Sequence, residues 1–166
     1  MSAYELAQLN IGVIKGPMDS ALMADFANNL ERINAVADAS PGFVWRLQTE
    51  AGDATAIRPF DDPNLLVNMS VWRDVESLNR YVYSSAHVEI MRRRREFFER
   101  MNVAFLVLWW VPRGHRPPVD EAMARLEMLR AQGPSAMAFT FRHAFPPPDA
   151  SPAQPRVAFD DTCPAT

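Results

Sequence analysis

The sequence is poor in cysteine, lysine and glycine, and these shortages exclude several classes of protein. Cys163 is the only cysteine in 166 residues, so neither an internal disulfide nor a cysteine-rich metal site is expected. Lys15 is the only lysine, and a formal net charge of −3 gives no basic surface typical of nucleic-acid binding. The six glycines form no GxGxxG, P-loop or GxSxG pattern, which argues against a Rossmann cofactor, a nucleotide phosphate site and a serine-hydrolase elbow.

Long apolar runs are also missing. No stretch approaches the roughly 20 apolar residues needed to cross a bilayer. The start, MSAYELAQL, lacks the basic and apolar segments of a signal peptide. We therefore predict a cytoplasmic protein with no membrane partner. Its composition, 48% apolar and 22% charged, is ordinary for a globular domain. Prolines are frequent from residue 146 onward, so we predict a domain over residues 1–145 and a Pro-rich tail, flexible alone, over 146–166.

Hydrophobic periodicity predicts the secondary structure. Side chains alternate between apolar and polar over residues 4–14, 43–50, 65–72 and 136–145, as in half-buried strands. Residues 104–111 are apolar throughout, as in a strand that is covered on both faces. Apolar residues recur every three or four positions over 22–37, 78–101 and 119–129, which predicts helices, the second of them interrupted at Ser84 and Ser85. The order is βαββαβ with an added αβ.

This order predicts an α+β, ferredoxin-like fold, with helices on one side of an antiparallel sheet. In the first three strands one face is apolar, and the other carries a set of polar side chains: Gln8, Asn10, Arg46, Gln48, Asn68 and Ser70. We expect the helices to cover the apolar face and a second copy of the chain to cover the polar one. A homodimer of this kind would be a dimeric α/β barrel.

Several segments, taken together, resemble one bacterial family. They are LAQLNIG at 6–12, SPGFVWRLQ at 40–48, VNMSVWRDVESL at 67–78, the Tyr-Ser-Ser-Ala-His segment at 83–87, LWWVPRGH at 108–115 and EAMARLEMLRAQGPSAMAFTF at 121–141. The family is a domain of unknown function in the dimeric α/β-barrel superfamily, and the resemblance covers about residues 4–145. It implies the barrel fold. The superfamily includes cofactor-free antibiotic-biosynthesis monooxygenases, haem-degrading and haem-peroxidase relatives, muconolactone-isomerase-like enzymes and stress-response proteins, so the resemblance implies no single reaction.

Two of the three histidines are candidate catalytic residues. His87 lies where the interrupted helix restarts, at about the place where members of the superfamily often carry a histidine. Pointing inward, it could be a general base or an axial haem ligand; otherwise it bonds the backbone at a helix start. His115 follows Arg113 and Gly114 in a turn, where it could serve a site or simply tie the turn to the next helix. His143 is more typical of an edge or core position, and the spacing of the three predicts no metal site.

The candidate substrate-binding residues are Arg46, Asn68, Trp72, Trp110 and Arg113. The first three come from two strands and are expected to face the same way, where they would hold an anionic or carbonyl-bearing aromatic ligand or else form a buried network. Trp110 and Arg113 lie where an aromatic strand end meets cationic residues, as at the mouth of a pocket. The run Arg92–Arg95 is interpreted as a solvated helix face or a set of intersubunit salt bridges.

Three functions are compatible with these residues. The leading hypothesis is a homodimeric enzyme that acts on a hydrophobic aromatic or polycyclic small molecule, by oxidation with dioxygen or by a proton-transfer rearrangement, without a cofactor. Arg46, Asn68 and Trp72 would position the substrate, and His87 or His115 would move the proton. The second is a haem protein with His87 as axial ligand. The third is a non-enzymatic small-molecule-binding or stress protein.

Overall fold

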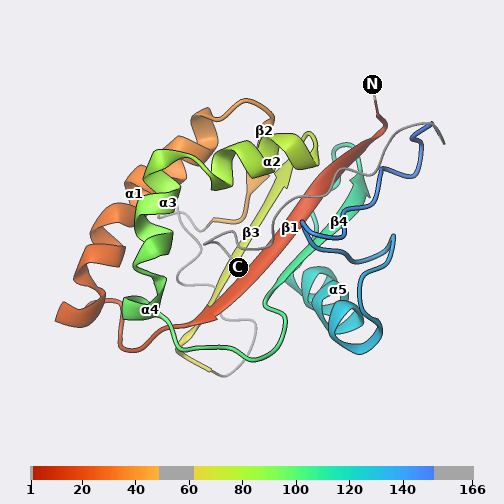
Figure 1. Cartoon of the computed structure of the whole chain (residues 1–166). Helices are drawn as coiled ribbons and strands as arrows, with labels where there is room; N and C mark the ends of the chain where they lie inside the picture. The colour runs from red at the N-terminus through yellow and green to blue at the C-terminus, as the bar shows by residue number, and fades with distance from the viewer. Residues whose placement is uncertain (1, 49–61, 152–166) are drawn as a thin grey trace.

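The computed structural model describes residues 2–48 and 62–151, which form a four-stranded sheet with helices on both sides (Figure 1). None of the helices within these ranges is both long and apolar enough to span a bilayer. The elements in chain order are β1 (Tyr4–Val13), the 3-10 turn η1 (Ala21–Met23), α1 (Ala24–Ala39), β2 (Phe43–Arg46), β3 (Leu65–Trp72), α2 (Val75–Val82), α3 (Ser85–Arg92), α4 (Arg94–Phe97), β4 (Leu106–Pro112) and α5 (Val119–Gln132).

The sheet has the strand order β2-β3-β1-β4, and all its pairs are antiparallel. Since β1 and β2 are separated by β3, the chain crosses over the sheet through α1, and it crosses again through α2, α3 and α4 before β4. This arrangement is the ferredoxin-like α+β fold, as predicted from the order of the elements. The register of β1 with β3 places Gln8 opposite Ser70 and Asn10 opposite Asn68, so four polar side chains lie together on one face.

The expectation that the helices all lie on the apolar side of the sheet is wrong, because among the described helices only α5 lies there. Figure 1 shows α1, α2 and α3 on one side of the sheet and α5 on the other. The first group covers the polar face, because that face also carries Leu6, Trp72 and Leu108, which are 0% exposed and belong to a core with Leu78 and Val82 of α2. The apolar face packs against α5, whose contribution to its core is Ala122, Leu126 and Leu129. Gln8 and Ser70 of the polar set are therefore buried within a single chain, whereas Gln48 and Asn68 stay exposed.

An irregularity in β2 corrects the facing of its residues. Simple alternation predicts that Phe43 and Trp45 point the same way, but the pairing with β3 shifts by one residue between them. Phe43 consequently packs edge-on against Trp72 on the side of α1 and α2, whereas Trp45 joins the core beneath α5. A bulge of this kind inserts one extra residue into a strand and reorients the residues after it. It leaves Arg46 opposite Ser70, on the polar face. Residues 49 and 50 of the predicted strand lie outside the described residues.

The first turn of α2 is held by Asp74. Its Oδ1 accepts hydrogen bonds from the Ser77 backbone N–H at 2.8 Å and from the Ser77 hydroxyl at 2.6 Å, and its Oδ2 accepts one from Arg73 at 2.9 Å. Burial alone would raise the pKa of this carboxyl, but the hydrogen bonds from Ser77 and Arg73 outweigh it and hold the pKa below its ordinary value. The predicted interruption at Ser84 and Ser85 is confirmed, since α2 ends at Val82 and α3 begins at Ser85.

We expect Asp74→Ala to lower the free energy of unfolding at pH 7 by about 0.5–2 kcal/mol, the usual cost of losing an N-cap. Because the folded-state pKa of Asp74 is depressed, its contribution is present above the unfolded pKa and is lost as the pH falls through the folded value. Urea denaturation should therefore show a difference between wild type and variant that shrinks below about pH 4. Asp74→Asn, which keeps a capping oxygen without a charge, should lose less than Asp74→Ala at pH 7, and its difference from wild type should shrink over the same pH range, because the titrating group is the wild-type carboxyl.

The predicted last strand, residues 136–145, is wrong. Only Phe139 pairs with β4: it exchanges two backbone hydrogen bonds of 2.8 Å with Leu108. Turns on both sides stop the pairing, since Ser135 and Ala138 bond each other's backbone and the His143 N–H bonds the Thr140 hydroxyl. Phe139 and Phe141 are buried in one core as predicted, but the predicted alternation fails before them, since Met137 is exposed and Ala138 is buried. Residues 152–166 of the predicted tail lie outside the described residues.

Candidate functional site

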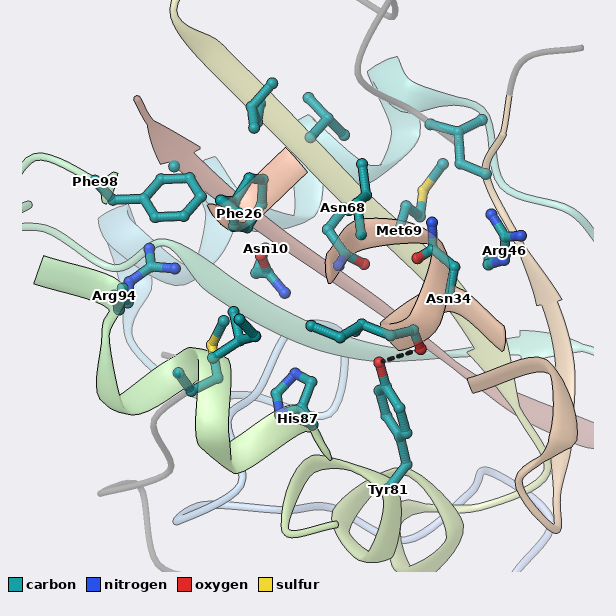
Figure 2. Close-up of a pocket in the computed structure, with 18 residues that line it drawn as sticks. Asn10, Phe26, Asn34, Arg46, Asn68, Met69, Tyr81, His87, Arg94 and Phe98 are labelled. Carbon is teal, nitrogen blue, oxygen red and sulfur yellow. Dashed lines mark hydrogen bonds between the residues drawn. The ribbon is translucent and has the colours of Figure 1, made fainter. Parts of the chain in front are cut away.

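A cavity of about 110 Å³ lies between the polar face of the sheet and the helices α1 and α3 (Figure 2). Asn10 of β1 and Asn68 of β3 form its floor, and a smaller hollow of about 30 Å³ continues it toward Gln8, Ser70 and Trp72. Its walls are mostly apolar and include Phe26, Leu30, Ile33, Ile90, Met91 and Phe98. A largely apolar cavity with a few polar groups on its floor is typical of a small-molecule site.

The floor is a hydrogen-bonded network. The Gln8 side-chain N–H group donates to Asn68 Oδ1 at 3.0 Å and to Ser70 Oγ at 2.9 Å, and Trp72 Nε1 donates to the same Ser70 oxygen at 2.8 Å. The indole N–H of Trp72 is thus engaged in the network, and the ring is fully buried. Because the oxygen of Asn68 accepts from Gln8, its N–H group is the part of that amide directed to the cavity. Asn68 is itself exposed, so it can meet a ligand.

His87 is the histidine that lines the cavity. It lies in the first turn of α3, 7% exposed, and its Nδ1 is 2.8 Å from the carbonyl oxygen of Val82. A carbonyl only accepts, so Nδ1 carries the proton and Nε2 keeps its lone pair. Burial lowers the pKa of His87 to about 4, against a smaller opposing effect of the bond to Val82. The imidazole is therefore neutral near pH 7, with a basic nitrogen available to the cavity.

Tyr81 is a cavity residue that sequence reasoning assigned only to the apolar stripe of its helix. Its ring stacks on Trp72 at 5.1 Å and contacts His87 at 4.9 Å, and its hydroxyl is 3.5 Å from the Ile33 carbonyl oxygen of α1. Burial raises the pKa of this hydroxyl, so it stays protonated and can donate. The available signal was a tyrosine shortly before His87, on the same helical face as Leu78.

The two arginines of the cavity differ in their partners. Arg46 pairs with Asp38 of α1 through Nε to Oδ1 at 2.8 Å and Nη2 to Oδ2 at 3.3 Å. Arg94 lies at the opposite end (Figure 2), with its guanidinium carbon 4.7 Å from the centre of the Phe98 ring and 4.8 Å from that of Phe105. Burial lowers the pKa of Arg94. The charge of Arg46 is thus balanced by a carboxylate, while that of Arg94 rests on aromatic faces.

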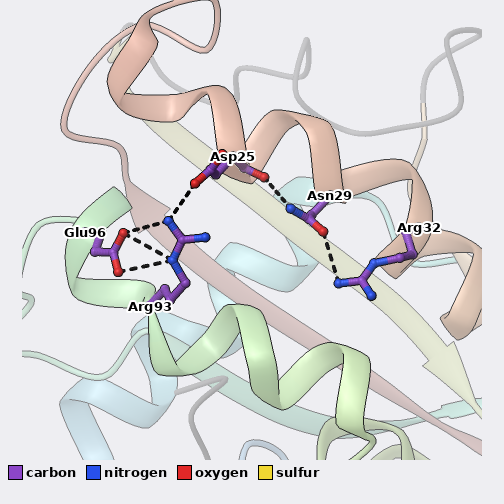
Figure 3. A network of polar contacts seen from close by, with 5 residues as sticks. All are labelled: Asp25, Asn29, Arg32, Arg93 and Glu96. Carbon is purple, nitrogen blue, oxygen red and sulfur yellow. Dashed lines mark hydrogen bonds and ion pairs between the residues drawn. The ribbon is translucent and has the colours of Figure 1, made fainter.

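The neighbouring residue, Arg93, points outward and ties the helical walls together (Figure 3). Its guanidinium bonds Asp25 of α1 at 2.8 Å and Glu96 at 2.9 Å. A second pair, Arg32 with Glu89 at 3.2 Å, joins α1 to α3. The run of arginines is therefore only partly a solvated surface, because Arg94 turns inward to the cavity. This inward turn was not predicted from the sequence.

Gly12 allows the Phe98 end of the cavity to close. A Cβ at this position would lie 2.5 Å from Cδ1 and 2.7 Å from Cε1 of the Phe98 ring. Phe98 also packs edge-on against Phe26 of α1 at 5.3 Å, so its ring has little freedom to withdraw. Glycine in β1 thus permits an aromatic side chain to lie directly on the sheet beside Arg94.

The structure brings together four of the residues predicted as site residues. Arg46, Asn68, Trp72 and His87 line the cavity and its smaller continuation, and they come from β2, β3 and α3. The prediction that Arg46, Asn68 and Trp72 face the same way is confirmed. The additional lining residues that sequence reasoning did not single out include Asn34, Tyr81, Met91 and Arg94.

The other three predicted residues lie outside the cavity. His115 Nε2 is 2.8 Å from Glu121 Oε2 at the exposed start of α5, and Glu121 also accepts from Trp109. Trp110 Nε1 donates to the Phe145 carbonyl at 2.8 Å, and Arg113 donates to that of Ser2. Neither tryptophan of the pair lines the cavity: Trp109 packs under α5, and Trp110 lies against Phe139. These contacts join β4 and the turn after it to α5, to Phe145 and to Ser2, and so have a structural role.

Residues 5–155 match the family described as Domain of unknown function (DUF3291). The chain belongs to this family. The resemblance recognised in the sequence is therefore confirmed, and the match continues beyond residue 145, where we placed the end of the domain. No curated protein matches the sequence.

Solved structures give weaker likenesses. SnoaB, a cofactor-independent oxygenase from Streptomyces nogalater, is 20% identical with a TM-score of 0.46, covering 70% of this chain and 99% of its own. A conserved protein from Methanosarcina mazei Go1 is 13% identical with a TM-score of 0.48, covering 66% and 93%. Rv0793 from Mycobacterium tuberculosis is 11% identical with a TM-score of 0.46, covering 69% and 99%. These values assign no activity to the chain.

Proposed function

We propose that this protein is an enzyme that removes a proton from a carbon atom of an apolar aromatic small molecule. The observation that carries the proposal is His87: a buried, neutral imidazole whose Nδ1 is engaged by Val82 and whose Nε2 is left as a base inside an apolar cavity. Removal of a proton from carbon is the first step of both a cofactor-independent oxidation and a proton-transfer rearrangement, so one site serves either outcome.

The residues around His87 fit this step. The proton would pass from carbon to Nε2, and the electron pair of the broken C–H bond would move onto the oxygen of a carbonyl conjugated with that carbon, giving an enolate. The Asn68 amide N–H group can donate to that oxygen, since Asn68 Oδ1 is held by Gln8. Although burial disfavours a lone imidazolium, the imidazolium and the enolate form together as an ion pair, which reduces the cost of each charge.

In the oxidative branch, dioxygen would receive the electrons of the enolate. A CH2 group would become C=O, one oxygen atom would remain in the product, and the other would leave as water with the two hydrogens. In the rearrangement branch, the proton would return from His87 to another carbon. Arg46 and Trp72 would hold the aromatic body in both branches.

The cytoplasmic location and the homodimer belong to this proposal, and a monomer found by light scattering at micromolar concentration would contradict the dimer.

Anthrone is a suitable probe because its CH2 group is acidic and lies opposite a carbonyl on a flat aromatic body. We expect the protein to accelerate exchange of these hydrogens for deuterium in D2O without oxygen, as followed by proton NMR. An oxygen electrode under air then separates the branches, since only oxidation consumes dioxygen. Exchange at the buffer rate with saturating anthrone would contradict the proposal.

An absorption spectrum distinguishes the proposed function from haem binding. A haem protein ligated through His87 would show a Soret band near 400 nm, on the order expected for any bound haem, and would lose it in His87→Ala. Under the present proposal, protein supplemented with haem and passed through a desalting column stays colourless. A Soret band of one haem per chain that is lost in His87→Ala would contradict the proposed proton abstraction and would support a haem protein.

A further inference from the structure

Arg94 is the cation of the cavity that lacks an acidic partner. Its neighbour Arg93 binds Asp25 and Glu96, and Arg46 binds Asp38, but among the described residues no carboxylate lies within ion-pair distance of Arg94. Within residues 2–48 and 62–151, its guanidinium makes one long hydrogen bond, from Nη2 to the Ile11 carbonyl at 3.5 Å. Since a guanidinium has five N–H donors, most of its donor capacity is unused within the described part of the chain.

The surroundings of Arg94 favour the binding of an anion beside its guanidinium. The guanidinium carbon lies over two aromatic rings, 4.7 Å from the centre of Phe98 and 4.8 Å from that of Phe105, and these rings shield part of it from water. Burial also lowers its pKa, which means that the charge is less stable there than in water. An anion in the same place would relieve that penalty. No Asp or Glu lies among the described residues that line the cavity, so these residues themselves supply none.

We propose that the substrate is an aromatic carboxylic acid, and that the cavity binds its carboxylate through the guanidinium of Arg94. This inference rests on the proposed function, since it names the class of molecule that His87 acts on. A carboxylate is favoured because the planar guanidinium offers paired N–H donors that match its two oxygens. The apolar walls formed by Phe26, Met91 and Phe98 accept the rest of the molecule.

The layout of the cavity gives the orientation of this ligand. Figure 2 shows Arg94 and Phe98 at one end, Arg46 and Tyr81 toward the other, and His87 between them below the sheet. A carboxylate at Arg94 therefore directs the aromatic body across Asn10 and Asn68, and the carbon that loses a proton comes to lie beside His87. Arg46 is not the anion receptor, because its charge is already balanced by Asp38.

The test compares a matched pair of probes, 2-naphthoate and its neutral isostere 2-naphthamide, by isothermal titration calorimetry on the full chain. We expect wild type to bind the naphthoate about tenfold or more tightly than the amide, as is usual for a hydrogen bond between charged groups. Arg94→Gln should weaken the naphthoate by a similar factor and leave the amide unchanged. Arg94→Lys, which keeps the charge, should retain part of the preference. Arg95→Gln, next in the sequence and exposed, is the matched control and should behave as wild type.

Thermal unfolding of each variant shows whether the change at position 94 leaves the fold intact, and binding of 2-naphthamide reports the cavity itself. If wild type binds both probes equally, or binds neither, the assignment of a carboxylate substrate is wrong. If naphthoate is preferred but Arg94→Gln keeps the preference, Arg94 is not the receptor and the inference fails. Exchange of anthrone, which has no carboxylate, tests the proposed function separately, so the two failures are distinguishable.

Discussion

Replacing His87 by alanine is expected to slow exchange of anthrone hydrogens by about a hundredfold to ten-thousandfold, the usual contribution of a positioned general base. The loss should appear in the rate at saturation more than in the concentration of anthrone needed for half saturation. His87 occupies one side of the cavity, whereas most of the apolar contact area comes from other residues such as Met91 and Phe98. Proton NMR in D2O at several anthrone concentrations measures both quantities.

The pH profile of the wild-type rate gives a second signature of His87. Burial depresses its pKa from 6.5 to about 4, so Nε2 of the folded protein stays unprotonated as the pH falls through 6.5. We expect a catalysed rate, after subtraction of the buffer reaction, that does not fall at pH 6.5 and declines only toward pH 4. The same shift implies that folding holds His87 neutral where the unfolded chain would protonate it, so stability decreases as the pH falls below about 6.5.

His115→Gln is the matched control for both measurements. His115 is paired with Glu121 at an exposed turn, away from the cavity, so its loss should leave the rate and its pH profile unchanged. His87→Gln gives a polar side chain at position 87 without a basic nitrogen, and it should be as slow as His87→Ala. Wild-type rates in His87→Ala, or a rate that falls with an apparent pKa near 6.5 and depends on His115, would contradict the role assigned to His87.

Replacing Gly42 by alanine is expected to lower the free energy of unfolding by roughly 2–5 kcal/mol, the sum of a left-handed backbone and of overpacking. Gly42 ends the turn between α1 and β2 with a φ of 87°. A Cβ there would overlap both Oγ and Cβ of Ser77. The contact with Ser77 Cβ is set by the backbone of α2, so a rotation of the side chain cannot relieve it. Urea denaturation followed by tryptophan fluorescence measures the loss.

Gly114→Ala separates the two contributions. Gly114 has nearly the same φ, 88°, but no atom of the described part of the chain lies within 4 Å of an added Cβ. We expect this variant to lose about 1–2 kcal/mol, from the backbone alone. Equal losses at Gly42 and Gly114 would show that the close approach to Ser77 is relieved elsewhere. Since α2 carries Tyr81 into the cavity, Gly42→Ala should also weaken 2-naphthamide binding, while Gly114→Ala should not.

The sequence by itself determined the elements and their order. Strand alternation at residues 4–14 and 65–72 and the break at Ser84 and Ser85 follow from the preferences of residues close in the chain. The ferredoxin-like order then follows, because short connections and right-handed crossovers leave few ways to arrange βαββαβ. Grouping Asn68 with Trp72 also succeeded, since residues four apart on a strand share a face. Arg46 joins them from the neighbouring strand, where it lies opposite Ser70.

The tertiary structure alone decided which face the helices cover, and with it where the site lies. Alternation defines two faces of each strand, but here the polar face also carries Leu6, Trp72 and Leu108, so the pattern did not say which face needs covering. The inward turn of Arg94 and the single bridge at Phe139 likewise depend on elements that meet only after folding. The pairing of His115 with Glu121, by contrast, agrees with the alternative read from the sequence, in which His115 ties its turn to the next helix. Contacts between distant segments leave no periodic signal in the chain, and the cavity around His87 is built from such contacts.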